Sequence, residues 1–296
     1  MTDMNTSAAT AVAGATRPSL LGAHALSRRF GGLVAVDSVD LDVAEGEVHG
    51  LIGPNGAGKT TLLNLLSGHL RASSGSVTFD GRDITRQPAE RRAAMGIRRT
   101  FQNLRLFRDM SALDNIKVGL HAGTRSEVLP ALLRTPFQRQ EEAEITEKAR
   151  QAMTFVGLLH VADQPAGTLA YGHQRLVEIA RAFVARPRLM LLDEPAAGLN
   201  GTESQHLVDF VRRIRDAGVT ILLIEHRMDV VMPTCDRITV LNYGRLLARG
   251  TPREVRSDTA VISAYLGKAA AAIGGAGRAR TPASAGAVAE DANAAH

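Results

Sequence analysis

The chain has 296 residues, 45% of them apolar, so it is long enough to bury the hydrophobic core of an ordinary globular protein. Its single cysteine, Cys235, excludes an internal disulfide framework, and no apolar stretch approaches the roughly 20 residues that a membrane-spanning helix needs. The net charge of +5 is not concentrated in basic runs interleaved with aromatic residues, so we expect solvated surface charge and no nucleic acid partner.

The two ends of the chain differ from the rest in composition. Residues 1–19 are rich in Ala, Thr and Ser, and residues 268–296 are rich in Ala and Gly without any Leu or Phe. Neither end can bury enough apolar surface to offset the entropy lost on ordering, so we expect two disordered tails around a domain at 20–267. The N-terminus lacks a charged region followed by an apolar block, so no signal peptide is expected.

The first part of this domain has the pattern of β-strands. Residues 33–43 alternate apolar and polar side chains, residues 45–47 form a turn, and Val48–Ile52 is a short apolar strand. Residues 76–79, followed by Asp80 and a glycine, predict a strand that enters a hairpin.

A predominantly helical pattern then extends over residues 89–186, and strands and helices alternate after it. Leu176, Ile179, Ala180 and Phe183 follow the spacing of one amphipathic helical face. The predicted later strands are 189–192, Thr220–Ile224 and 238–241, and Cys235 before the last of them is expected to be a small buried hydrophobe. This alternation predicts a parallel sheet covered on both faces, with the helical stretch as an insertion.

The helix between the first two of these strands has recognisable start and stop signals. Thr202 and Gln205 have the spacing of a capping box, and Gly218 stops the helix.

One stretch of eight residues matches the phosphate-loop pattern, and a threonine follows it. These residues are Gly53, Pro54, Asn55, Gly56, Ala57, Gly58, Lys59, Thr60 and the following Thr61. A strand precedes the motif and a helix follows it, so main-chain N–H groups and the positive end of the helix face one point. Lys59 would reach the β- and γ-phosphates, and the Thr60 hydroxyl would bind Mg²⁺. The sequence therefore predicts ATP and Mg²⁺ as ligands.

The predicted strand at 189–192 ends in two carboxylates, Asp193 and Glu194. Ligands of open α/β sheets bind at the carboxyl ends of such strands. We predict that Asp193 helps to hold Mg²⁺ and that Glu194 polarises the attacking water as a general base. Taken alone, two acids after a strand more often cap a helix, but the phosphate loop in the same chain favours the catalytic interpretation.

Together these motifs resemble those of the ATP-binding-cassette (ABC) ATPases, and the resemblance assigns roles to further residues. Gln102 is similar to the glutamine that contacts Mg²⁺ and water, and His226 to the switch histidine that bonds the γ-phosphate. Residues 169–175 stand in the place of the family signature, whose N–H groups face a nucleotide bound by an opposite subunit. Its nucleotide-contacting positions are Ala170, Tyr171, Gly172 and His173. Phe30 matches the aromatic residue that stacks on adenine, with an ordinary core phenylalanine as the alternative.

The resemblance covers about residues 20–267 and implies a fold. This fold is α/β, a P-loop NTPase with a mostly parallel core sheet, an N-terminal antiparallel β subdomain and an inserted α-helical subdomain at about 103–187. The sequence departs from the family pattern at Ala170 (usually Ser), His173 (usually Gln) and Asn200 (often Asp). None of these departures removes an element of hydrolysis within this chain, and they bear instead on how this chain completes a partner's site. The loss of one charge-assisted hydrogen bond there would cost about 1.5–3 kcal/mol.

Finer details resemble the ATP-binding subunits of branched-chain amino acid importers. They lie at 101–107, 169–172, 194–200 and 264–267. The resemblance implies membrane-spanning permease subunits, a second ABC ATPase subunit, indirectly a solute-binding protein, and a peripheral place on the cytoplasmic face of the inner membrane. Residues 101–113 offer Leu104, Leu106, Phe107 and Met110 as anchors for a permease helix, with packing inside the helical insertion as the alternative.

Three other classes remain open. A lipid or lipopolysaccharide exporter would use the same ATPase, and only the signature and contact-loop details argue against it. Soluble ABC proteins that act on DNA or ribosomes usually have two cassettes, coiled coils or zinc-binding cysteines, whereas this chain has one phosphate loop and one cysteine. A non-catalytic scaffold is disfavoured because Lys59, Asp193, Glu194 and His226 are all present.

Overall fold

The computed structural model describes residues 18–121 and 136–265, and its strands form two sheets. The smaller, antiparallel sheet has the order β2-β1-β4-β5. Its strands are β1 (Ser19–Phe30), β2 (Leu33–Ala44), β4 (Ser74–Phe79) and β5 (Arg82–Asp83). This sheet is the expected N-terminal antiparallel subdomain.

The larger sheet has the order β10-β9-β3-β8-β7-β6. Its strands are β3 (Val48–Ile52), β6 (Ile97–Arg99), β7 (Leu189–Asp193), β8 (Thr220–Ile224), β9 (Arg237–Asn242) and β10 (Arg245–Gly250). Only the pairing of β9 with β10 is antiparallel, so the prediction of a mostly parallel core sheet is confirmed. The carboxyl ends of β3, β7 and β8 therefore meet at one edge of the sheet.

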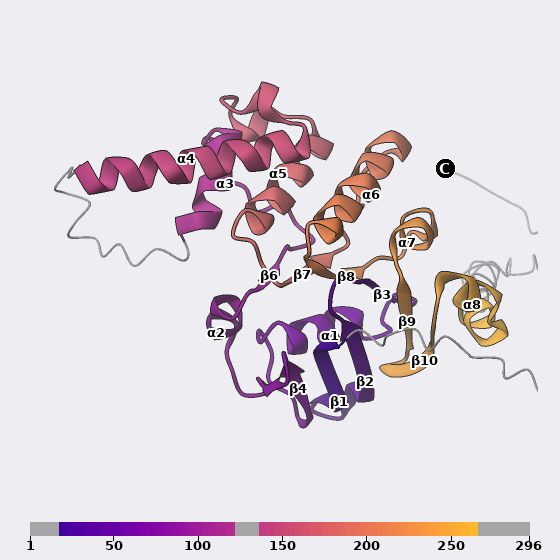
Figure 1. Cartoon of the computed structure of the whole chain (residues 1–296). Helices are drawn as coiled ribbons and strands as arrows, with labels where there is room; N and C mark the ends of the chain where they lie inside the picture. Colours follow the sequence, from indigo (N-terminus) through magenta and orange to yellow (C-terminus); the bar gives the residue numbers. More distant parts are fainter. Residues whose placement is uncertain (1–17, 122–135, 266–296) are drawn as a thin grey trace, which may run out of the picture.

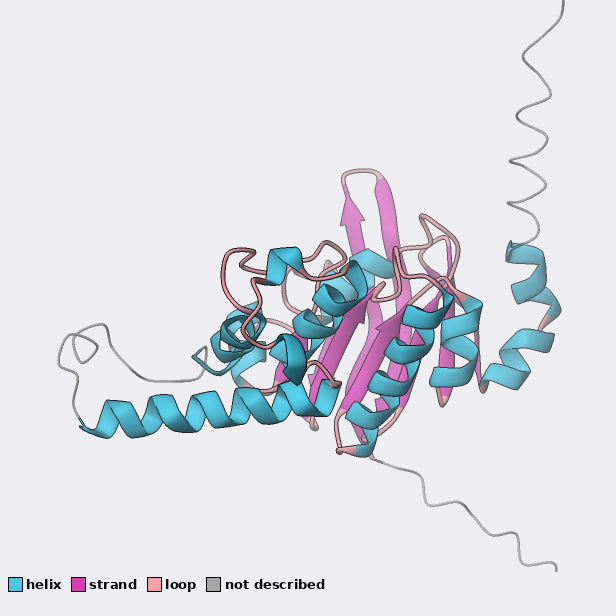
Figure 2. Cartoon of the chain, turned by 90° about the horizontal axis from the view of Figure 1, so that it is seen from above, coloured by secondary structure: helices cyan, strands magenta, loops and turns pink. Residues whose placement is uncertain are grey.

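Helices surround this sheet on both faces and at one end. They are α1 (Lys59–Leu66), α2 (Ala89–Ala94), α3 (Ala112–His121), α4 (Pro136–Val156), α5 (Tyr171–Phe183), α6 (Gly201–Asp216), α7 (Met228–Thr234) and α8 (Pro252–Ser257). Figure 1 shows α3, α4 and α5 gathered away from β1, β2 and β4, and Figure 2 shows helices lying along the layer of strands. The helices α3–α5 thus form the helical insertion.

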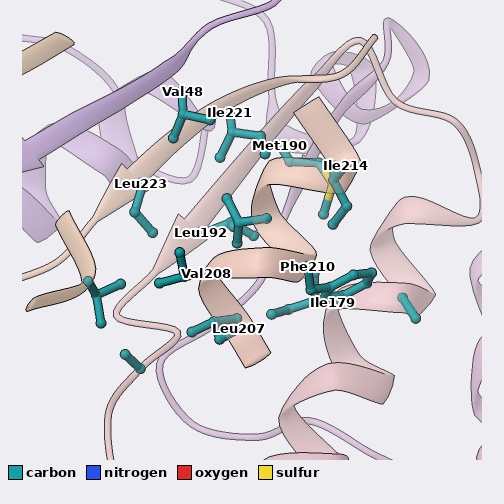
Figure 3. Packing of buried hydrophobic residues seen from close by; sticks show 14 of the residues in the cluster. Val48, Ile179, Met190, Leu192, Leu207, Val208, Phe210, Ile214, Ile221 and Leu223 are labelled. Carbon is teal, nitrogen blue, oxygen red and sulfur yellow. The ribbon is translucent and has the colours of Figure 1, made fainter. Parts of the chain in front are cut away.

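Alternate side chains of the core strands enter two different hydrophobic clusters. Met190, Leu192, Ile221 and Leu223 belong to the main cluster, which packs the sheet against α5, α6 and α7 (Figure 3). Their neighbours Leu189, Leu191, Leu222 and Ile224 belong to the second cluster, which joins the sheet to α1 and the antiparallel strands. Because both faces of the sheet are buried, apolar side chains are favoured on both sides of these strands. The strands therefore occur in the sequence as nearly continuous apolar runs instead of alternating apolar and polar residues.

The predominantly helical pattern over 89–186 is confirmed by α2, α3, α4 and α5, but it hides β6, a strand of the core sheet that contains two arginines among its three residues. The predicted capping box is wrong. The cap of α6 is Asn200 with Glu203, two residues before the predicted pair Thr202 and Gln205. Both pairs fit the spacing, but Thr202 already lies in the first turn of the helix, so it is not the residue that precedes the helix and caps it.

Several elements had no sequence prediction at all. Strand β1 was missed because a residue with positive φ, Ala25 (φ 44°), and shifts in pairing register interrupt its alternation. Strand β10 and helices α7 and α8 are also additional. Cys235 is 7% exposed, as expected, and β1 begins at Ser19, the last residue of the predicted N-terminal tail. Residues 1–17 of that tail and all of the C-terminal one, 268–296, lie outside the described residues.

Candidate nucleotide site

The phosphate loop connects the end of β3 to the start of α1. Helix α1 begins at Lys59, and the residue before it, Gly58, has φ 97°. A Cβ at Gly58 would lie 2.6 Å from the Ala35 carbonyl oxygen, and one at Gly53 would lie 2.3 Å from the Leu241 carbonyl oxygen. Only glycine fits at these two positions, which explains why the turn from strand to helix needs them.

A cavity of about 460 Å³ opens beside this loop. Its lining comprises Leu33, Val34, Ala35, Asn55, Gly56, Ala57, Gly58, Lys59, Thr60, Thr61, Glu194, Tyr243 and Gly244. Lys59 is buried, and its Nζ donates hydrogen bonds to the carbonyl oxygens of Gly53 (2.7 Å) and Pro54 (3.1 Å). The ammonium group is therefore held over the loop, on the side where the α1 N-terminus offers its N–H groups.

Asp193 and Glu194 lie where β7 ends, in different surroundings: Glu194 lines this cavity, whereas Asp193 is not among the lining residues. The Asp193 side chain is nearly buried and its Oδ2 accepts a hydrogen bond from Arg99 Nη2 at 3.0 Å. Glu194 has φ 46°, a left-handed conformation that is unfavourable for a residue with a side chain, and its N–H donates to the Ile224 carbonyl (2.9 Å). Such strain is retained where the surrounding structure fixes it, and it commonly marks a functional position.

Gln102 and His226 both reach the Glu194 carboxylate. Gln102 Nε2 donates to Glu194 Oε2 at 3.0 Å, and His226 Nδ1 lies 3.7 Å from Glu194 Oε1. Half of the His226 side chain is exposed, so the imidazole is accessible to a ligand beside Glu194. The three residues predicted as catalytic are thus brought together, although they come from three different loops.

The four signature residues lie at a different place. Ala170 is the N-cap of α5 but makes no side-chain cap hydrogen bond, so the N–H groups of this helix start are not satisfied by it. A Cβ at Gly198, in the loop after β7, would lie 3.1 Å from the Tyr171 ring, and Gly172 packs against Glu203. The rings of His173 and His160 meet edge to face with centroids 6.1 Å apart. None of residues 170–173 lines the cavity.

Phe30 lies at the end of β1 and is 45% exposed, so the alternative that it is an ordinary core phenylalanine is wrong. The Arg28 guanidinium lies 4.6 Å from the centre of its ring. A second aromatic ring, Tyr243, is 76% exposed and lines the cavity. Sequence reasoning missed Tyr243, because a lone aromatic residue before a glycine in a turn carries no pattern.

Three charged residues around the site were also missed. Arg99 bonds Asp193; Arg175 donates to the carbonyl oxygens of Phe101 (3.0 Å) and Gln102 (2.7 Å); and Glu225 is fully buried beside His226. Burial raises the pKa of the Glu225 carboxyl, against three backbone N–H groups that lower it. The sequence does show a charged residue at the end of an apolar strand, but this pattern alone does not identify the groups that the residue will bond.

The site combines a phosphate loop after β3 with two carboxylates at the end of β7, which is separated from β3 by β8. A glutamine and a histidine converge on one of these carboxylates. This arrangement defines a nucleotide-hydrolysing P-loop cassette with a helical insertion. Comparison with known proteins agrees. A family profile described as ABC transporter matches residues 36–197, and a second, described as branched-chain amino acid ATP-binding cassette transporter, matches residues 245–271. This chain belongs to the ABC transporter family, and it binds nucleotide and hydrolyses ATP.

Full-length relatives are similar to most of the chain. The high-affinity branched-chain amino acid transport ATP-binding protein BraF of Pseudomonas aeruginosa is 46% identical over 255 residues, covering 86% of this chain and 100% of BraF. LivG of Escherichia coli, described in the same words, is 43% identical over 251 residues, covering 84% and 98%. A probable LivG of Methanocaldococcus jannaschii is 35% identical over 253 residues, covering 84% and 98%.

Solved structures share the fold. A nucleotide-free ATP-binding cassette from an ABC transporter superposes with a TM-score of 0.74 at 33% identity, covering 84% of this chain and 99% of the other. An ATP-binding cassette in its ADP conformation superposes with a TM-score of 0.75 at 34% identity, with the same coverage. The nucleotide-free and ADP forms are therefore about equally similar to this structure.

Proposed function

We propose that this chain is the ATP-hydrolysing subunit of a transporter that imports branched-chain or other hydrophobic amino acids. The observation that carries the proposal is the convergence of Gln102, Glu194 and His226 beside the phosphate loop in a chain that matches BraF and LivG over nearly their whole lengths. The first part supports the chemistry, and the second supports the cargo.

The residues at the cavity fit ATP and a divalent cation. The phosphate loop presents backbone N–H groups and the Lys59 ammonium, which suit a triphosphate, and the exposed aromatic rings of Phe30 and Tyr243 suit a base. The Thr60 hydroxyl, the Gln102 amide and the Asp193 carboxylate supply oxygen ligands, which Mg²⁺ prefers. When bound, Mg²⁺ neutralises charge on the phosphate oxygens.

In this proposal Glu194 is the general base. Its carboxylate faces the cavity, and the two groups that reach it restrict its position: the Gln102 amide holds Oε2, while the His226 ring lies beside Oε1. Glu194 orients and polarises the attacking water, and His226 bonds the γ-phosphate that the water attacks.

The signature residues serve a second cassette. Ala170, Tyr171, Gly172 and His173 lie at the start of α5, away from the cavity of their own chain, and complete the site of an opposite subunit. Because Ala170 has no hydroxyl, the signature of this chain offers that site one side-chain donor fewer than a signature with serine would. A second cassette with an unaltered signature would supply that donor to the site of this chain, which favours a heterodimer with a related cassette over a homodimer.

The permease contact is proposed at residues 101–113. Phe107 is 53% exposed, whereas Leu106 is partly buried against the main cluster and so belongs to the packing of the helical insertion. Phe107 is therefore the anchor for a permease helix, on the cytoplasmic face of the inner membrane. Within the described part of the chain, no helix has the length and apolar character needed to cross a bilayer.

The domain limits proposed from the sequence are a cassette at 20–267, a helical subdomain at about 103–187 within it, and two disordered tails. The packing of α3 against α4 and α5 supports the internal limit.

The experiment is a purification with the Glu194→Gln variant, expressed in the native host and solubilised gently with ATP. The variant keeps the shape of Glu194 but loses the base, so we expect turnover to fall by about a hundredfold or more with ATP binding retained. Mass spectrometry should then identify multi-span permease subunits, a second cassette and a solute-binding protein, and Phe107→Ala should lower the yield of the permease.

The outcomes separate the classes. Permease subunits of an export system would overturn the direction and the cargo, and ribosomal or DNA-repair proteins without a membrane partner would overturn transport. Unchanged turnover in Glu194→Gln would overturn the base assignment.

A further inference from the structure

Glu225 is the first residue after β8, and its side chain is fully buried between two loops. One is the contact loop, residues 195–200, which follows β7 and ends at the start of α6. The other is the switch segment, residues 225–227, which contains His226. A carboxylate buried so completely requires partners for both of its oxygens.

The two oxygens of Glu225 are committed to different loops. Oε1 accepts a hydrogen bond from the backbone N–H of Ala196 at 2.7 Å, in the contact loop. Oε2 accepts from the backbone N–H groups of His226 (3.1 Å) and Arg227 (3.4 Å), in the switch segment. A single side chain thus joins the ends of two neighbouring strands of the core sheet.

Arg227, in the switch segment, makes a second link to the contact loop, this time through its side chain. Arg227 Nη1 donates to the carbonyl oxygens of Leu199 (2.9 Å) and Ala196 (3.4 Å), and Asp229 holds the guanidinium group. Ala196 therefore has both its N–H and its carbonyl group bound to the switch segment. The contact loop cannot shift without either breaking these bonds or moving the backbone of His226.

The chemistry of the link requires a carboxylate. A glutamine of the same shape has one acceptor oxygen and one NH₂ group, so in either orientation it turns a donor towards one of the two loops. An apolar residue would avoid the desolvation that raises the pKa of Glu225, but it would leave three backbone N–H groups unsatisfied.

We infer that Glu225 is a positioning residue that links the contact loop to His226, so that pressure from a second subunit on residues 198–200 sets where His226 lies relative to Glu194. The inference rests on the proposed arrangement of two cassettes. Gly198 and Asn200 are exposed on the surface of the contact loop, whereas Ala196 is fully buried against Glu225. A contact made outside is thereby carried to the imidazole that lies 3.7 Å from the Glu194 carboxylate.

The test is the Glu225→Gln variant of the full chain, assayed with the subunits that co-purify with it. We expect kcat for ATP hydrolysis to fall by about tenfold or more, while KM for ATP changes by less than about twofold, because the hydrogen bonds of Glu225 go to Ala196, His226 and Arg227 and not to the phosphate loop. Glu47→Gln is the matched control: its carboxylate is also buried, but it bonds Ala44 and His49 near the opposite end of β3.

A double-mutant cycle separates positioning from a general structural effect. In a His226→Ala background the group through which Glu225 acts is absent, so Glu225→Gln should cost less than about twofold in single-turnover rate. An equal fold loss in both backgrounds, an unchanged kcat in the single variant, or the same loss in Glu47→Gln would each overturn the inference.

A second variant covers the case in which Glu225→Gln does not fold. Arg227→Met removes the bonds to the Ala196 and Leu199 carbonyl groups, while the buried carboxylate stays in place, and it should lower kcat without raising KM. An unchanged kcat there would also overturn the link. If the wild-type complex itself does not hydrolyse ATP, the proposed function fails instead, so the two failures are distinguishable.

Discussion

Arg99 shows how one side chain can hold three elements of the site together. Its side chain and that of Asp193 are 8% and 7% exposed, and they pair at 3.0 Å across β6 and β7. The same guanidinium donates to Asn64 Oδ1 on α1 (2.6 Å) and to Oγ of Ser67, the C-cap of that helix (3.0 Å). The strand that carries Asp193 and the helix that follows the phosphate loop are therefore fixed relative to each other by one cation.

Replacing Arg99 should destabilise the fold. Arg99→Met leaves the Asp193 carboxylate buried without a partner, which typically costs about 3–5 kcal/mol. Denaturant unfolding would measure this loss. Arg98→Met is the matched control, since the neighbouring arginine is half-buried and donates to a single carbonyl, that of Ala93. A loss below about 1 kcal/mol in Arg99→Met, or an equal loss in both variants, would contradict the role of the pair.

At the level of single residues, the sequence predicted the members of the site better than the contacts between them. The phosphate loop, Asp193, Glu194 and His226 belong to motifs whose spacing is visible in the sequence. Arg99 and Glu225 do not, because their partners lie 94 and 29 residues away and only the sheet order brings them together. Charged residues at strand ends become informative once the neighbouring strands are known.

Helix α6 illustrates how neighbouring polar residues compete for one role in an element. Asn200 accepts from the Glu203 N–H at 2.9 Å, and the Glu203 carboxylate accepts from the Asn200 N–H at 3.0 Å. Thr202 and Gln205 have the same spacing but lie inside the helix. The sequence pattern alone placed the start of the helix two residues too late.

The two assignments make opposite predictions for stability. Asn200→Ala should lower the free energy of unfolding by about 1 kcal/mol, the usual value of an N-cap, whereas Thr202→Ala should change it by less than about 0.5 kcal/mol. Chemical denaturation of both variants would decide between them. A larger loss for Thr202→Ala would restore the cap expected from the sequence.

The elements that were missed have different physical causes. Among the described strands, β6 pairs with β7 alone, so it has less need of the apolar run that identifies its buried neighbours. Strand β1 bends at Ala25, and the alternation is lost there. The apolar strands and the amphipathic α5 were predictable because burial of one or both faces requires apolar side chains at a regular spacing in the sequence.

At the scale of the whole molecule, the segment after β10 contributes to the core. Val255 of α8 and Val261 are 2% and 6% exposed and belong to the main cluster. The second family profile, at 245–271, covers this same segment. The cassette therefore extends past its last strand, and this profile overlaps residues 268–271, the first four residues of the tail proposed from the sequence.

Two truncations test this limit. A chain that ends after residue 250 exposes the surface that Val255 and Val261 cover, and burying each valine contributes about 1.5–3 kcal/mol, so its melting temperature should fall by about 6–24 °C. A chain that ends after residue 267 should melt within about 1 °C of the full chain. Calorimetry would measure both, and a large fall for the longer chain would show that the tail packs on the domain.

The lone cysteine offers a view of how this molecule opens. A Cβ at Gly50 of β3 would lie 2.9 Å from the Cys235 sulfur, and burial raises the pKa of the thiol. The thiolate is the nucleophile that attacks an alkylating reagent, so Cys235 in the closed molecule does not react until β3, α7 and β9 separate. The rate of alkylation under native conditions therefore measures the free energy of that opening, and saturating nucleotide should slow it if the phosphate loop and this part of the sheet open as one unit.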